Sequence, residues 1–153
     1  MLVKLGSRTV TEDVVDLLIA CHERIRTFIA MATRITADAG PDAREAAGQV
    51  RRYFAEAFPL HVADEEELLP IPPRIHDDHV AHAPAIDRLV AMCAAVEQGG
   101  PVPAELAPLA EQLERELTEH LAIEERDVFP ALRALPEAER TRIRDAIRAR
   151  RAR

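Results

Sequence analysis

Nearly the same string occurs twice in this chain, as "HVADEEELLP" at residues 61–70 and as "HLAIEERDVFP" at residues 120–130. Each copy starts with a histidine, has a glutamate four positions later and closes on a proline that we expect to end a helix. Positions four apart in an α-helix lie about 40° apart around its axis and about 6 Å apart along it. The repeat therefore predicts two helices that each present a histidine and a glutamate on one face. These pairs are His61 with Glu65 and His120 with Glu124.

The composition is that of a globular helical domain. Of the 153 residues, 48% are hydrophobic and 31% charged, and only 3% are aromatic. Ala, Leu, Glu and Arg are abundant, and all four favour helix over sheet. A chain of this length forms one domain as a rule. We expect a single domain over residues 1–153, with a helical bundle at about 11–135 and a basic tail at 136–153.

Charge, cysteine content and hydropathy exclude several classes of protein. The formal net charge of −7 argues against a nucleic-acid binder. Cys21 and Cys93 form no CxxC pair, so we expect a reducing compartment and plain core packing for both thiols. The N-terminus lacks the apolar run of a signal peptide, and no apolar stretch approaches bilayer length. These features predict a cytoplasmic protein without a membrane partner.

Apolar residues at three- and four-residue steps predict an all-α fold. Thr9 and Glu12 fit a capping box that opens the first helix, which the sequence "DAGPD" stops. Pro59 and Pro84 fall inside predicted helices, where we expect kinks. Short connections between long helices favour an up-down-up-down four-helix bundle with a short C-terminal basic helix or tail. The predicted helices cover about 11–35, 42–69, 74–97 and 104–135.

All six histidines fall in these four helices, and their spacing suggests a duplicated unit. His22 precedes His61 by 39 residues, and His82 precedes His120 by 38. The third helix also carries His76 and His79. The repeat favours His82 as the counterpart of His22. His79 lies about 60° away on the same face and is the natural second ligand, whereas we expect His76, near the helix start, to be solvated.

A metal centre explains these groups together. A single histidine among apolar neighbours is most simply a hydrogen-bonded core residue, but buried glutamates are costly unless they are paired or bind a cation. Imidazole and carboxylate without thiolate suit iron, manganese or zinc. Four or five imidazoles exceed what one ion takes beside two carboxylates. Two ions bridged by Glu65 and Glu124 would use every group.

These motifs resemble the hemerythrin-like HHE cation-binding domains. The resemblance rests on His22, "HVADEE" at 61–66, "HDDHVAH" at 76–82 and "HLAIEE" at 120–125. It implies a non-haem di-iron centre with an oxo or hydroxo bridge inside the bundle. Glu125 is an alternative bridge, because some relatives use the fifth position after the histidine. The implied metal ligands are His22, His61, Glu65, His79, His82, His120 and Glu124.

The resemblance implies binding or sensing of O₂ or a related ligand such as NO or peroxide. We expect a binding module rather than an enzyme, because no further acid, base or substrate cleft is visible in the sequence. One alternative is a di-iron oxidase or ferroxidase, although no histidine here has a glutamate three positions before it. Another is a regulatory or iron-handling bundle that acts through partners. The observation behind this alternative is the basic end after Pro136, which is either a solvated helix or a segment that docks an acidic partner or nucleic acid.

Overall fold

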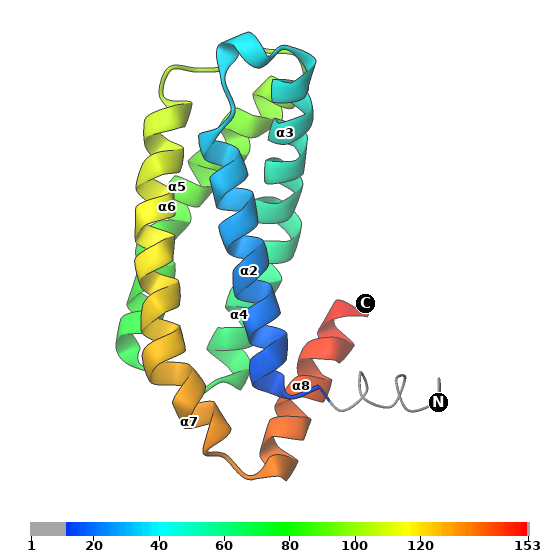
Figure 1. Ribbon diagram of the computed structural model, residues 1–153, viewed down its shortest axis with the longest axis vertical. Helices are drawn as coiled ribbons and strands as arrows, with labels where there is room; N and C mark the ends of the chain where they lie inside the picture. Colours follow the sequence, from blue (N-terminus) through cyan, green and yellow to red (C-terminus); the bar gives the residue numbers. More distant parts are fainter. Residues whose placement is uncertain (1–11, 153) are drawn as a thin grey trace.

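The computed structural model describes residues 12–152, and these residues form helices without a strand (Figure 1). The prediction of an all-helical fold is confirmed, whereas the up-and-down order of four helices stays a prediction. The α-helices are α2 (Val14–Thr33), α3 (Pro41–Arg52), α4 (Phe58–Leu68), α5 (Pro73–Glu97), α6 (Leu106–Ile123), α7 (Phe129–Arg133) and α8 (Glu137–Arg151). The short turns are the 3₁₀ turn η1 (Ala37–Ala39) and the π-helical turns η2 (Tyr53–Ala57) and η3 (Glu124–Val128).

Helix α2 begins at a different cap from the predicted one. The side chain of Asp13 accepts a hydrogen bond from the backbone N–H of Val15 at 3.1 Å, which satisfies one of the free donors of the first turn. The predicted capping residue Thr9 lies outside the described residues. No helix within residues 12–152 is both long enough and apolar enough to cross a bilayer.

Two Phe-Pro pairs each follow a π-helical turn. The N–H of Phe58 donates to the carbonyl of Tyr53, and the N–H of Phe129 donates to the carbonyl of Glu124. Proline has no N–H to continue the ordinary ladder, so a wider turn precedes Pro59 and Pro130. The expectation that Pro130 ends its helix is wrong, because the chain continues through η3 into α7.

Two apolar clusters lie at different levels of the bundle, and the histidines and glutamates of the repeat lie between them. One cluster contains Ile25, Phe54 and Leu117, and the other contains Leu18, Ile75 and Ile123. Along α2, the order Leu18, His22, Ile25 passes from one cluster to the other through a histidine. The helices therefore bring a layer of buried polar groups together between two apolar layers.

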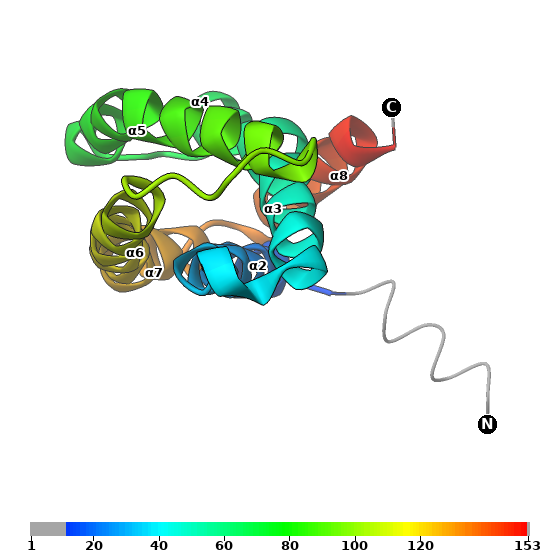
Figure 2. The ribbon, with the colours of Figure 1, turned by 90° about the horizontal axis from the view of Figure 1, so that it is seen from above.

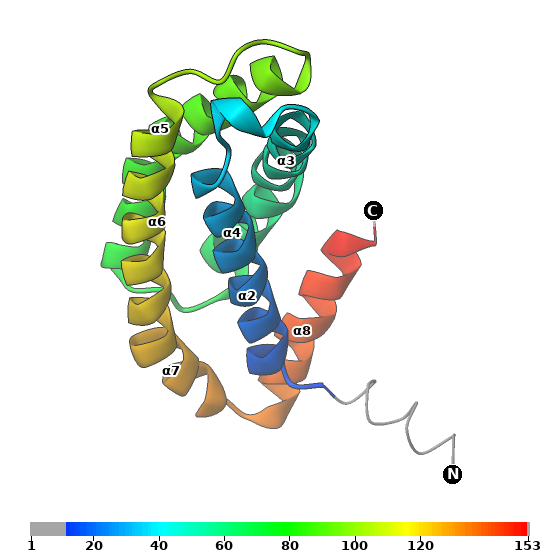
Figure 3. The same cartoon turned by 45° about the horizontal axis from the view of Figure 1, so that its top comes forward.

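The basic C-terminal segment is a helix that packs on its own chain. Helix α8 lies beside α2 and α4 at one end of the bundle (Figures 2 and 3). Its Ile143 and Ile147 are buried in the second cluster. Arg140 pairs with Asp13, and Arg148 lies 3.5 Å from Glu12. The expectation of a solvated helix therefore holds only for the outer face of α8, because its inner face is buried.

Candidate metal centre

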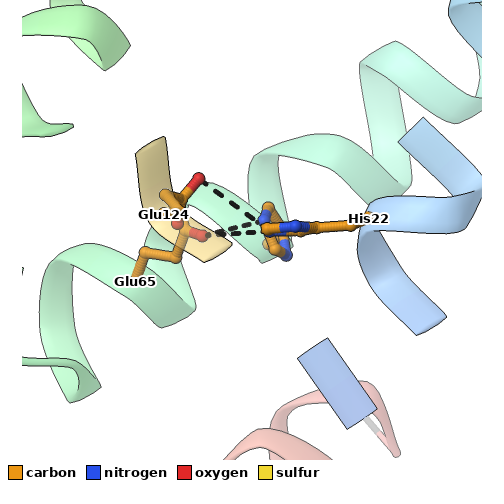
Figure 4. A group of neighbouring side chains, drawn as sticks. His22, Glu65 and Glu124 are labelled. Atoms are coloured by element: carbon orange, nitrogen blue, oxygen red, sulfur yellow. Dashed lines mark ion pairs between the residues drawn. The ribbon is translucent and has the colours of Figure 1, made fainter. Parts of the chain in front are cut away.

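Five polar side chains meet in the layer between the apolar clusters. Helix α2 supplies His22, α4 supplies His61 and Glu65, α6 supplies His120, and η3 begins with Glu124. Each is at most 4% exposed. Figure 4 shows His22 and both glutamates pointing toward one another. The two copies of the repeat thus face each other.

Glu65 reaches two groups of histidines through its two oxygens. Its Oε2 lies 3.0 Å from Nε2 of His61 and 4.0 Å from Nε2 of His22. Its Oε1 lies 2.9 Å from Nε2 of His79 on α5. A carboxylate with one oxygen toward each of two histidine groups has the arrangement that a bridging ligand needs.

Glu124, like Glu65, lies between two histidines of the cluster. Its Oε1 lies 2.8 Å from Nε2 of His120 and 3.9 Å from Nε2 of His22. The donor atoms form two sets, each within 4.8 Å of one another, and Glu65 belongs to both. One set contains His22, His61, Glu65 and Glu124, and the other contains Glu65, His79 and His120.

Several of these buried atoms have no hydrogen-bond partner. They include Nε2 of His22 and His61, Oε2 of Glu65 and both carboxylate oxygens of Glu124. Unsatisfied buried polar atoms are rare in folded proteins because each one costs free energy. Their convergence at one place fits a cation that these atoms would coordinate. The imidazole and carboxylate donors suit iron, manganese or zinc.

A model of the hemerythrin HHE cation-binding domain matches residues 71–151, which is more than half of the chain. The chain belongs to the hemerythrin HHE family. The matched region contains α5, α6 and α8, whereas His22, His61 and Glu65 lie before it. No curated protein and no solved structure gives a significant match. The buried histidine–glutamate cluster agrees with the cation binding from which this family takes its name.

The two central carboxyls of this HHE domain differ in acidity. Burial raises the pKa of both groups. The charge of His61, together with the nearby polar groups of Glu124 and His22, nevertheless holds the pKa of Glu65 well below its usual range. Burial and the neighbouring Glu65 raise the pKa of Glu124 to about 7. The metal-free pair therefore holds a proton on Glu124 below neutral pH, as two nearby buried carboxyls should.

Three of the four histidines that reach these glutamates also bind a second carboxylate through Nδ1. Nδ1 of His22 lies 2.9 Å from Glu125, Nδ1 of His79 lies 2.8 Å from Glu66, and Nδ1 of His120 lies 3.1 Å from Asp78. Such outer carboxylates fix the tautomer and orientation of ligating histidines.

The sequence pattern did not predict these positioning roles of Glu66, Glu125 and Asp78. Glu66 and Glu125 directly follow the paired glutamates Glu65 and Glu124. The repeated "EE" at 65–66 and 124–125 was the signal that could have indicated the roles of Glu66 and Glu125. Glu125 also accepts hydrogen bonds from Arg26 at 3.0 and 2.9 Å.

The three histidines of α5 have different surroundings. His79 is 8% exposed and contacts Glu65, whereas His76 is 56% exposed and pairs with Glu66. The ring of His82 packs against that of His120 with centroids 5.7 Å apart, and His82 belongs to neither set of donor atoms. The geometry thus favours His79 over His82, although the spacing of the repeat favoured His82.

A cavity of about 220 Å³ adjoins the centre. Its polar wall contains Glu65, His79, His82 and His120, and its apolar wall includes Phe54 and Leu117. One water molecule occupies about 30 Å³ of liquid, so the cavity has room for a ligand of several atoms. His82 lines this cavity beside His120 and supplies no atom to either set of donors.

Proposed function

We propose that this HHE domain binds two iron ions in an oxo- or hydroxo-bridged centre and that the centre binds or senses O₂ or a related ligand such as NO or peroxide. The observation that carries the proposal is the position of Glu65, whose two oxygens face different histidine groups. Iron would supply the electrons that binding of O₂ requires. His22, His61, His79 and His120, with Glu65 and Glu124, would hold the ions.

The residues of the chain would line the approach of this ligand and hold the ligating histidines in place. Apolar side chains around the cavity, such as Phe54 and Leu117, exclude water from the face of the centre. The outer carboxylates Glu125, Glu66 and Asp78 hold three of the imidazoles in place. A cavity with an apolar wall beside the centre favours capture of a small uncharged ligand.

The test is iron titration of the metal-free protein without oxygen, followed by exposure to O₂. We expect about two ions per chain and a charge-transfer band that appears with O₂ and disappears when O₂ is removed. Irreversible oxidation with turnover of peroxide would instead support an oxidase. A stoichiometry near zero after careful loading would exclude the di-iron proposal.

A matched pair of variants tests the bridging role. Glu65→Gln should lose the second equivalent of iron, because a neutral amide bridges two cations poorly. Glu119→Gln is the control, because the Glu119 side chain is 70% exposed and its Oε1 lies 3.3 Å from Arg74. Equal loss in the two variants would mean that the histidine–glutamate repeat does not build the site.

A further inference from the structure

His61 differs from the other histidines of the cluster on the side away from the glutamates. Its Nδ1 is buried and meets no carboxylate, and its neighbour on this side is the thiol of Cys21, whereas Nδ1 of His22, His79 and His120 each meets a carboxylate. A metal bound at Nε2 requires the proton to be on Nδ1, which then needs an acceptor. The chain supplies a carboxylate in three places and omits it in the fourth.

A second cavity, of about 250 Å³, lies at this face of His61. Its lining residues are Cys21, Arg24, Tyr53, Ala57, Leu60, His61 and Arg151. Two of them are guanidinium cations, and none of them is acidic. The cavity therefore has the charge of an anion site, and Tyr53, Ala57 and Leu60 give it an apolar part.

The donors at this cavity are only partly used. Nη2 of Arg151 lies 2.6 Å from Asp64, whereas its buried Nη1 meets no carboxylate and the thiol of Cys21 lies nearby. Nη2 of Arg24 donates to the sulfur of Cys21 at 3.5 Å, and a thiol sulfur is a weak acceptor. Because of this weakness, a carboxylate between Arg151 and His61 would satisfy both buried donors better than Cys21 does.

We propose that this cavity binds a small organic monocarboxylate, whose carboxylate accepts from His61 Nδ1 and Arg151 and whose apolar end lies against Leu60 and Ala57. The ligand would complete the pattern of one outer carboxylate for each histidine of the cluster. Because such carboxylates increase the metal affinity of a histidine, ligand and metal should each tighten the binding of the other by the same factor.

Calorimetric titration of the metal-free full chain with butyrate tests the cavity independently of the proposed di-iron function. We expect saturable binding of one butyrate per chain and no measurable binding of butyramide, which has the same shape without the charge. Chloride should bind at least about tenfold more weakly, because it has no apolar end. Absence of saturable butyrate binding, or equal affinity for chloride, would overturn the proposal.

Variants locate the binding site. Arg151→Gln should weaken butyrate binding by about tenfold, as expected for loss of a charged donor. Arg24→Gln should weaken it as well, because the cavity loses one of the two cations that line it. Arg133→Gln, an exposed arginine on α7, is the control and should bind as the parent does. Because Arg151 also holds Asp64, Arg24→Gln decides the outcome if Arg151→Gln unfolds. Unchanged binding in Arg24→Gln would overturn the assignment to this cavity.

A zinc titration with and without butyrate tests the coupling. Saturating butyrate should tighten zinc binding to the parent protein by roughly tenfold or more, and His61→Gln should abolish that effect. Equal zinc affinity with and without butyrate would show that the carboxylate does not meet Nδ1 of His61.

Discussion

Nδ1 of His22 lies 2.9 Å from Oε2 of Glu125, the residue that follows Glu124 in the chain. The two consecutive glutamates of the second repeat therefore have different tasks. Glu124 turns into the centre of the bundle, and Glu125 contacts the outer edge of a histidine supplied by α2. The π-helical turn that starts at Glu124 contains both residues. Such turns often occur at functional sites.

Replacing Glu125 by Gln should weaken metal binding without abolishing it. The neutral amide would support His22 less well and would also lose its charge pairing with Arg26. Loss of an outer partner of a ligating histidine typically costs 10–100-fold in metal affinity. Competition against a chelator measures the change, and Glu114→Gln, on an adjacent helix segment, serves as the control. An affinity equal to that of the control would contradict the positioning role of Glu125.

His79→Ala and His82→Ala should have different effects. His79 contacts Glu65 at 2.9 Å, so its removal should reduce the iron content toward one ion per chain. His82 lines the cavity and packs on His120, so its removal should leave the iron content near two and change the rate of ligand entry. Metal analysis and stopped-flow mixing with O₂ measure the two effects. A larger loss of iron from His82→Ala would restore the assignment that the repeat favoured.

The sequence predicted contacts within one helix but not those that depend on how the helices pack. The i, i+4 spacing placed His61 with Glu65 and His120 with Glu124, because helical geometry alone fixes those relationships. The choice between His79 and His82 depends on how α5 is rotated against α4, which no local spacing determines. The contact between His22 and Glu125 joins residues 103 positions apart and depends on the packing of α2 against η3. At Pro59 we expected a kink and at Pro130 a helix end, but in both places a wide π-helical turn precedes the proline.

Removing the cationic partners of Asp64 should destabilise the fold more than neutralising Asp64 itself. Asp64 is fully buried, and its oxygens lie 2.8 Å from Arg150 and 2.6 Å from Arg151. The double change Arg150→Gln and Arg151→Gln leaves a buried carboxylate unpaired, which costs about 3–5 kcal/mol. Asp64→Asn leaves two arginines that are partly exposed and can reach water.

Chemical denaturation of the metal-free proteins measures this difference. Because a protonated carboxyl needs no counter-ion, the deficit of the double variant should shrink as the pH falls. Arg142→Gln, whose side chain is 61% exposed, is the control on the same helix and should unfold like the parent. A double variant as stable as Asp64→Asn would mean that α8 does not neutralise Asp64.

The stability of the metal-free protein should fall as the pH rises from 7 to 10. Burial lowers the pKa of His61, but Glu65 and Cys21 together raise it to about 10 from an unperturbed value near 6.5. A raised pKa means that the folded state holds the proton more tightly than the unfolded state. This contribution is complete below pH 6.5 and disappears as the pH passes 10, with a slope of at most about 1.4 kcal/mol per pH unit.

Metal binding should show the opposite dependence on pH over the same range. The ion must displace the proton of His61 and, below neutral pH, that of Glu124, so the metal affinity should rise with pH. The stabilisation by a fixed zinc concentration, measured as the shift in melting temperature, should therefore grow from pH 6 to pH 9. In His61→Gln the metal-free protein should lose most of its decline in stability between pH 7 and 10. An unchanged decline in that variant would mean that another group carries the proton.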